Sequence, residues 1–233
     1  AVISIPIATL IFRLKGAYFA IGTWVVAEVF RLSFAQIQAL GGGSGSSLPV
    51  AVVKELGARK ATREANAYWL ALGAAVVVLL AVYLFLRSRR GLALTAIRDS
   101  EVAASGLGID IWRTKLEVYV VTSAFTAIIG GLIFLQKLRI SPDAAFSVND
   151  WTAFVIFIVV IGGIGTLEGP IIGTLLFFAL REVLADFGTI YLMVLGLVAI
   201  VVMLKAPKGV WGLIRDRYDL EFFPLSYRVR QKD

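Results

Sequence analysis

The sequence predicts an all-α, polytopic membrane protein, and three observations lead to this fold class. Hydrophobic residues make up 59% of the 233 positions, and charged residues only 17%, where soluble domains carry about 25%. The mean hydropathy is +0.85. Uncharged runs of about 20 residues, the length that crosses a bilayer, recur along the chain. We expect six to seven hydrophobic helices, with one Gly/Pro-broken pair and one short helix outside the membrane.

The first two hydrophobic elements are unequal. Residues 1–12 form an apolar run that is too short to span a bilayer, whereas 16–35 is long enough and carries Glu28 and Arg31 within an apolar pattern. Because Ala1 is not an initiator methionine, we expect further spans before it.

The remaining elements follow a similar pattern. Residues 67–86 and 118–136 are uncharged and long enough to span, and 187–204 provides 18 residues. Between them, 151–167 and 171–180 form one long hydrophobic stretch that is interrupted by helix-breaking residues. These are Gly162, Gly163, Gly165, Gly169 and Pro170. We expect two helices joined by a tight Gly-rich turn.

The distribution of basic residues predicts the orientation. Alternate crossings place Arg13 and Lys15, the segment 87–115 and the tail 205–233 on one side, with 15 Lys and Arg against 8 on the other. The side richer in Lys and Arg is cytoplasmic. We expect a transmembrane domain over 1–204, with a cytoplasmic loop at 87–115, and a cytoplasmic basic tail over 205–233.

Composition excludes several function classes. The chain has no Cys and no His, which excludes disulfides, thiolate nucleophiles, imidazole bases and the usual zinc sites, so we expect neither an enzyme nor a cofactor. The loop 41–49 is glycine-rich but lacks the lysine of a phosphate-binding loop, and a flexible linker is the alternative interpretation. The net charge of +7 is explained by basic loops rather than by nucleic-acid binding.

The segment 87–110 predicts a short helix outside the membrane. Asp99 or Ser100 can cap its N-terminus, Glu101 lies in the first turn, and Gly106 or Gly108 can end it. Two turns are too short to be stable alone, so something must hold the helix. Its apolar residues would form a small knob that fits a groove on a partner: Val102, Ala103 and Ala104. The alternative is a structural elbow between two spans.

Residues 90–110 resemble the cytoplasmic loop of the permease subunits of branched-chain amino acid ABC importers, the LivM type. Three other stretches agree with this family in order along the chain: the R-x-R-G-x-Y-x-A-I-x-T helix at 13–23, the outer Gly-rich loop at 41–48, and the G-G-x-G-T-x-x-G-P-x-x-G turn at 162–173. The chain departs from the family pattern at Ala17, where Asp is common, at Ser46–Ser47, and in an insertion-like segment at 50–64.

The resemblance implies a subunit of a larger transporter in the bacterial inner membrane. Its partners would be a second, non-identical permease, two ABC ATPase subunits, a periplasmic substrate-binding protein and the lipid bilayer. The short helix would transmit ATPase closure to the spans, a rearrangement of packed helices. The implied ATPase-coupling residues are Asp99, Ser100, Glu101, Ala103, Ala104 and Gly106.

Candidates for the substrate path are weakly polar or charged residues within the spans. They are Thr23, Glu28, Ser123 and Thr126, with Gly130 and Gly131 allowing close helix approach. Packing between helices is the alternative role for such Ser, Thr and Gly residues. Glu28 and Arg31 lie on one helix face and could form either an anchor or a gate.

Two alternative functions stay open. Similar permeases handle urea and short-chain amides. A secondary transporter also uses Gly/Pro-broken helices, but it needs coupling carboxylates near the middle of the membrane. The four carboxylates near the spans all lie toward span ends: Glu28, Glu168, Glu182 and Asp186.

Overall fold

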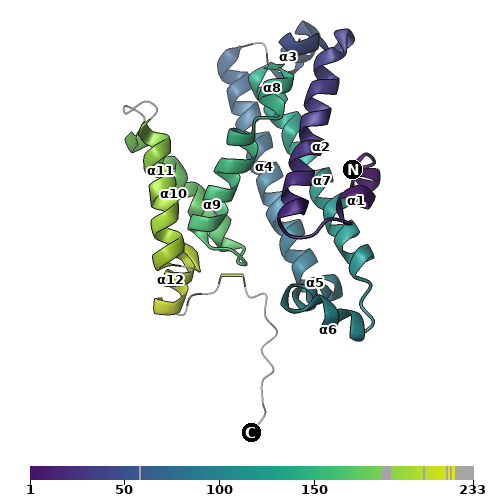
Figure 1. Cartoon of the computed structure of the whole chain (residues 1–233). Coiled ribbons are helices and arrows are strands. Elements are labelled where there is room, and N and C mark those ends of the chain that lie inside the picture. The colour runs from purple at the N-terminus through teal and green to yellow at the C-terminus, as the bar shows by residue number, and fades with distance from the viewer. Residues whose placement is uncertain (58, 185–189, 207, 219, 221, 224–233) are drawn as a thin grey trace. The chain divides into compact units, whose positions relative to one another are not determined.

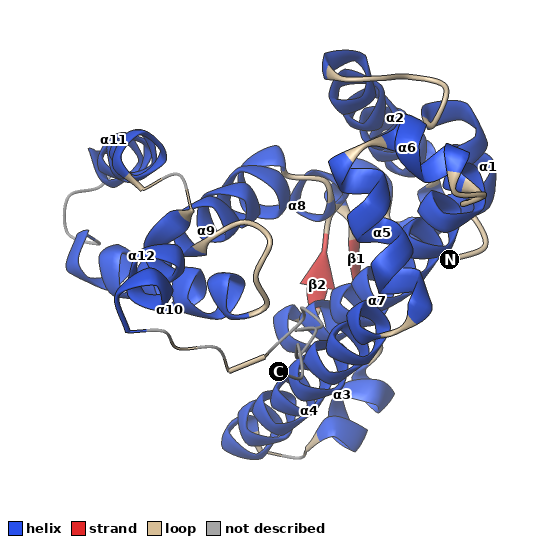
Figure 2. Ribbon diagram, turned by 90° about the horizontal axis from the view of Figure 1, so that it is seen from below, coloured by secondary structure: helices blue, strands red, loops and turns tan. Residues whose placement is uncertain are grey.

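The computed structural model describes residues 1–57, 59–184, 190–206, 208–218, 220 and 222–223 (Figure 1). Within these residues the predicted all-α class is confirmed, since helices dominate and the strands β1 (Ser46–Ser47) and β2 (Arg139–Ile140) form one short antiparallel pair (Figure 2). The chain divides into two compact units, Ala1–Phe146 and Ser147–Asp233, which are described separately.

The first unit is built around two long helices, α4 (Lys60–Arg87) and α7 (Ile111–Lys137), which pack against each other. Helix α1 (Ser4–Ile11) packs on both α7 and α2 (Ala17–Gln36). The shorter elements connect them: η1 (Gln38–Leu40), η2 (Gly42–Ser44), α3 (Val50–Leu56), α5 (Arg89–Asp99), α6 (Glu101–Gly106) and α8 (Pro142–Ala145).

The second unit contains a hairpin of helices. The π-helical turn η3 (Asn149–Ala153) leads into α9 (Phe154–Gly162), which packs along α10 (Glu168–Leu184). Helices α11 (Ile190–Lys205) and α12 (Gly209–Tyr218) cover this pair. The core of the unit consists of Phe157, Ile161, Phe177 and Leu195.

Four helical stretches have the length and composition of membrane spans. They are Ala17–Gln36, Lys60–Arg87, Ile111–Lys137 and Pro142–Gly162, and a pair bent by 41°, Met193–Lys205 with Gly209–Tyr218, could be a fifth. The chain is therefore a multi-pass membrane protein. Seven predicted hydrophobic elements thus give four or five candidate spans in the described residues, because α1 has only eight residues and α10 only 17, both shorter than a span of about 20 residues.

Some sequence predictions lie partly outside the described residues. The expected span at 187–204 begins there, Asp186 lies there, and so do residues 224–233 of the expected basic tail. The division into a domain at 1–204 and a tail at 205–233 stays a prediction.

Candidate functional site

The predicted short helix forms, and a side-chain cap fixes its start. Helix α5 ends at Asp99, and Ser100 then adopts an extended backbone with φ of −163°. The Ser100 Oγ accepts a hydrogen bond from the amide of Ala103 at 3.2 Å. Of the two cap positions that the sequence allowed, Ser100 is thus the N-cap, because Asp99 is still helical.

Backbone hydrogen bonds and a glycine end helix α6, and a second side-chain cap begins the next helix. Helix α6 ends at Gly106, and the amide of Leu107 donates to the carbonyl oxygens of Ala103 and Ala104. Gly108 then takes a left-handed φ of +80°, which turns the chain away. Asp110 begins α7 by accepting from the Arg113 amide at 3.0 Å.

One ion pair ties α6 to the long helix α7. The Glu101 Oε1 lies 2.5 Å from Nζ of Lys115, and both side chains are partly exposed. The hydrogen bond from Lys115 lowers the pKa of Glu101, and the positive charge of Lys15 lowers it further. Lys115 was not predicted from the sequence, because no local pattern relates it to a residue 14 positions earlier.

The exposed apolar residues of α6 differ from the predicted knob. Ala104 is 1% exposed and packs within the chain, so the expectation that it faces a partner is wrong. Val102 is 85% exposed and Leu107 is 78% exposed, and Ala103 is also exposed. The surface that a partner can reach therefore consists of Val102, Ala103 and Leu107, which we call the α6 patch.

A groove of about 940 Å³ lies beside α6, in the first unit. It is bordered by the α1–α2 turn, by α5 and α6, and by the first three turns of α7. Its lining residues include Phe12, Lys15, Phe19, Glu101, Trp112, Lys115 and Tyr119. None of the predicted substrate-path residues lines this groove.

Three of the predicted substrate-path residues make hydrogen bonds within their own helices. The hydroxyl of Thr23 donates to the carbonyl of Ala20 at 2.8 Å, that of Ser123 to Tyr119 at 2.6 Å, and that of Thr126 to Thr122 at 2.9 Å. These bonds fit the packing interpretation at least as well as a substrate path. Gly130 and Gly131 have open space beside them, with no described atom within 4 Å of an added Cβ.

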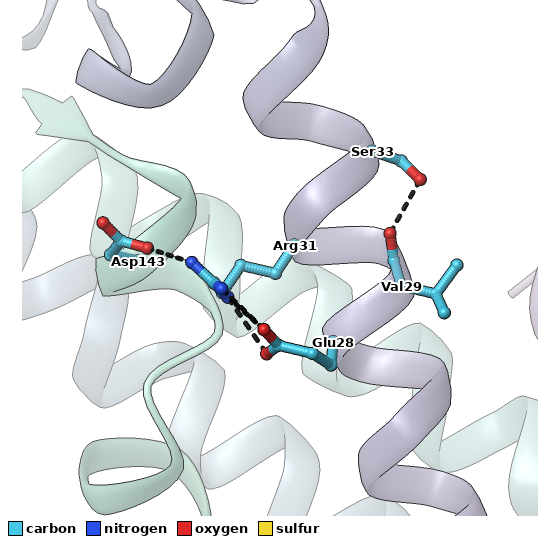
Figure 3. Close-up of polar contacts among 5 residues, drawn as sticks. All are labelled: Glu28, Val29, Arg31, Ser33 and Asp143. Carbon is cyan, nitrogen blue, oxygen red and sulfur yellow. Dashed lines mark hydrogen bonds and ion pairs between the residues drawn. The ribbon is translucent and has the colours of Figure 1, made fainter.

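Glu28 and Arg31 form a charged cluster with a third residue (Figure 3). The Arg31 Nε lies 3.0 Å from both carboxylate oxygens of Glu28, and its Nη1 lies 2.5 Å from Oδ1 of Asp143. Asp143 belongs to α8, 112 residues later in the chain, and was not expected from the sequence. The cluster therefore fastens the C-terminal half of α2 to α8.

The Gly-rich loop is folded against β2. The Arg139 guanidinium donates to the carbonyl of Ser44 at 2.9 Å, and the Leu48 amide donates to the carbonyl of Leu138 at 2.9 Å. Gly45 has a left-handed φ of +82°, and an added Cβ would collide with the backbone of Ile140. These contacts argue against the flexible-linker interpretation.

The predicted Gly-rich turn joins α9 to α10 and depends on close backbone approach. An added Cβ at Gly162 would collide with the carbonyl of Gly169, and one at Gly163 would lie 2.7 Å from the carbonyl oxygen of Lys208. Gly163 also has a φ of +130°, which disfavours side chains. Gly165 has a φ of +87° but open space around it.

Two polar contacts stabilise the start of α10. The Thr166 Oγ1 accepts from the amide of Gly169 at 3.1 Å, and Pro170 occupies the first turn, where a missing N–H is harmless. Glu168 is 7% exposed, and its Oε1 accepts from the amide of Phe223 at 2.8 Å. Neither this contact nor the packing of Gly209 against Gly163 was predicted from the sequence.

The family described as the permease component of branched-chain amino acid transport systems matches residues 1–204. The chain is 28% identical to the high-affinity branched-chain amino acid transport system permease protein LivM of Salmonella typhimurium and to that of Escherichia coli. Each alignment covers 91% of this chain and 54% of the relative.

A second kind of relative also matches. The probable branched-chain amino acid transport permease protein LivH of Methanocaldococcus jannaschii is 27% identical over 59% of this chain and 46% of that protein. The chain spans about half the length of the curated relatives it matches. No solved structure matches it.

Proposed function

The chain belongs to the family of permease components of branched-chain amino acid transport systems, and from this premise we propose that it is a membrane-spanning subunit of an ABC importer. It moves branched-chain or other hydrophobic amino acids across the bacterial inner membrane, and separate ATPase subunits supply the free energy. In this proposal the chain itself performs no catalysis. The multi-pass fold and the similarity to LivM proteins support the proposal.

The α6 patch is the observation that carries the mechanism. Val102, Ala103 and Leu107 are exposed on a helix of six residues, which is too short to be stable without support. The support comes from the Ser100 cap and from the ion pair between Glu101 and Lys115.

The same contacts give the patch a mechanical connection to a span. A force on α6 reaches α7 through the ion pair and through the packing of α5 and α6 on α7. Helix α7 packs on α4, so closure of an ATPase dimer beneath the membrane would move two spans together. In this mechanism Ser100 and Glu101 position the coupling helix, and Ala104 holds it from inside.

The proposed assembly contains a second, non-identical permease, two ABC ATPase subunits and a periplasmic binding protein. Relatives with two different permease names, LivM and LivH, are both similar to the chain, which supports a pair of unlike permeases. The Gly-rich loop and β2 lie on the side predicted to face the periplasm, where a binding protein would deliver the substrate.

The test measures leucine uptake and ATP turnover in the same reconstituted vesicles. We expect Val102→Trp to reduce uptake at least tenfold per ATP hydrolysed, because a bulky ring on the α6 patch disturbs the contact with the ATPase. The matched control is Val50→Trp in α3, where the side chain is 69% exposed on the side predicted to be periplasmic. Equal uptake per ATP in both variants would contradict coupling through α6.

The same vesicles distinguish the two alternatives. Uptake of labelled urea or a short amide in place of leucine would identify the other substrate class. Uptake by the chain without ATPase subunits would identify a secondary transporter. The structure offers that class little support, because Glu28 is bound by Arg31 and Glu168 accepts a backbone hydrogen bond.

A further inference from the structure

The groove beside α6 carries one positive charge that the described part of the chain does not neutralise. Three charged residues line it: Lys15, Glu101 and Lys115. Glu101 and Lys115 pair with each other at 2.5 Å. Among the described residues, no hydrogen bond or ion pair engages the exposed Lys15. Its charge acts on Glu101, but the single carboxylate cannot neutralise two lysines, and one positive charge is left over.

The remaining wall is aromatic and apolar. Phe12 contacts Tyr119 edge to face, with ring centroids 5.6 Å apart, and stacks near Phe19 at 6.5 Å. Trp112, which is 46% exposed, lies on the first turn of α7 in the same wall. Basic residues and Trp or Tyr above an apolar surface are typical of the membrane–water interface.

The contents of the groove follow from its charge and its size. An amino acid zwitterion needs an acceptor for its ammonium group, but Lys115 already engages Glu101, the one carboxylate that lines the groove among the residues that the structure describes. The volume of about 940 Å³ lies near the top of the range of about 300–1,000 Å³ for pockets that hold drug-sized ligands. An anion with a long apolar part fits better than a small zwitterion.

We propose that this groove binds an anionic phospholipid of the cytoplasmic leaflet, with the phosphate at Lys15 and an acyl chain along Phe12, Phe19 and Tyr119. That leaflet is where basic pockets meet anionic headgroups. The site lies beside α6, so a bound lipid would hold the α1–α2 turn against α7. This proposal goes beyond transport itself. It rests on the proposed function only through the predicted orientation of the chain, which places α6 on the cytoplasmic side.

The experiment measures lipid binding by the full purified chain in detergent, using native mass spectrometry. The probes are phosphatidylglycerol and phosphatidylcholine with the same acyl chains. We expect the chain to prefer phosphatidylglycerol, and Lys15→Gln to weaken that preference about fivefold, since one basic residue near an anionic surface contributes about that factor. The preference should also fall as salt rises, because exposed charges are screened.

The matched control is Lys54→Gln, an exposed lysine in the last turn of α3 on the predicted periplasmic side. It should keep the full preference, and both variants should melt at the parental temperature in phosphatidylcholine. Three results would each overturn the proposal. They are an unchanged preference in Lys15→Gln, an equal loss in Lys54→Gln, and displacement of the lipid by glycerol phosphate alone, which would indicate a site for a soluble phosphate. Absence of any bound phosphatidylglycerol would overturn the proposal as well.

Discussion

Single residues in this chain are held by partners far away in the sequence, and the ion pair of Glu101 illustrates the consequence. Its pKa is lowered by the hydrogen bond from Lys115. A carboxylate whose pKa falls on folding stabilises the folded state at pH values above its ordinary pKa of 4.5. This stabilisation is lost as the pH falls through the lowered pKa of the folded state.

We therefore predict that Glu101→Gln lowers the melting temperature of the purified chain at pH 7, and that this difference from the parent shrinks as the pH falls below 4.5 and through the lowered pKa of Glu101. The reason is that the parental carboxylate takes up a proton as the pH falls through its lowered pKa, and the ion pair with Lys115 is then lost. The measurement compares the two melting temperatures across this range, which cancels the titration of all other groups. A difference that does not shrink at any pH down to acid unfolding would show that the ion pair is not its origin.

The Arg31 cluster gives a second prediction at this scale. Arg31 contacts both oxygens of Glu28, whose side chain is 44% exposed, but only one oxygen of Asp143, which is 75% exposed. Because exposed ion pairs contribute little, double-mutant cycles with Arg31→Gln should give a larger coupling energy for Glu28→Gln than for Asp143→Asn. A larger coupling with Asp143 would indicate that fastening α8 is the main role of the cluster.

Contacts between residues far apart in the chain were the least predictable from the sequence. Ser100 and Gly108 were predictable because caps and left-handed glycines are local signals. Lys115, Asp143 and Gly209 were not, because each meets its partner only after the helices have packed. Ala104 was misjudged for the same reason, since a short helix does not reveal from its sequence which face it buries.

Among the elements, helix α6 carries a buried apolar side chain, Ala104, two residues after an exposed one, Val102, and this contrast permits a matched pair of variants. Ala104 is 1% exposed and Val102 is 85% exposed. We predict that Ala104→Trp destabilises the isolated chain by about 3 kcal/mol, because the indole cannot fit without moving α6. Val102→Trp should change stability by less than about 0.5 kcal/mol. Unfolding of both variants in detergent is the measurement, and equal stability would mean that α6 is free to detach.

The turn between α9 and α10 supports a second prediction about elements. At Gly162 a Cβ would meet the backbone of Gly169, which cannot rotate away, so Gly162→Ala should cost about 3 kcal/mol. Gly130→Ala in α7 is the control, because it has open space and a helical backbone, and it should stabilise by about 0.5–1 kcal/mol. A neutral result for Gly162→Ala in thermal unfolding would contradict the close approach of these helices.

Element positions followed from the sequence better than element ends did. The predicted span at 16–35 corresponds to α2 at Ala17–Gln36. In contrast, α4 begins at Lys60 rather than at 67, and α7 begins at Ile111 rather than at 118. An uncharged run marks only the part of a helix that lies in lipid. The helix itself continues into water through charged turns, which keep the helical backbone hydrogen bonds but are not counted in the uncharged run.

On the scale of the whole molecule, the spans leave their apolar surface uncovered. In the most apolar windows of α2, α4 and α7 no residue is buried within the chain. Hydrophobic surface of this extent requires lipid or neighbouring helices, which agrees with a subunit of a larger membrane assembly. The sequence predicted this class from composition alone, whereas the number of spans depends on where helices bend, as between α11 and α12.

The orientation can be tested directly, because the chain contains no cysteine and each introduced thiol is therefore unique. Leu107 after α6 and Val50 at the start of α3 are 78% and 69% exposed, so Leu107→Cys and Val50→Cys should leave the fold intact. The excess of basic residues predicts that a membrane-impermeant maleimide labels Val50→Cys in intact spheroplasts. It should label Leu107→Cys only after the membrane has been permeabilised. The reverse pattern would mean that the basic segments 87–115 and 205–233 lie outside, and the α6 patch could then not meet a cytoplasmic ATPase. Labelling of both positions from one side would mean that α4 does not cross the membrane, because α4 separates them in the chain.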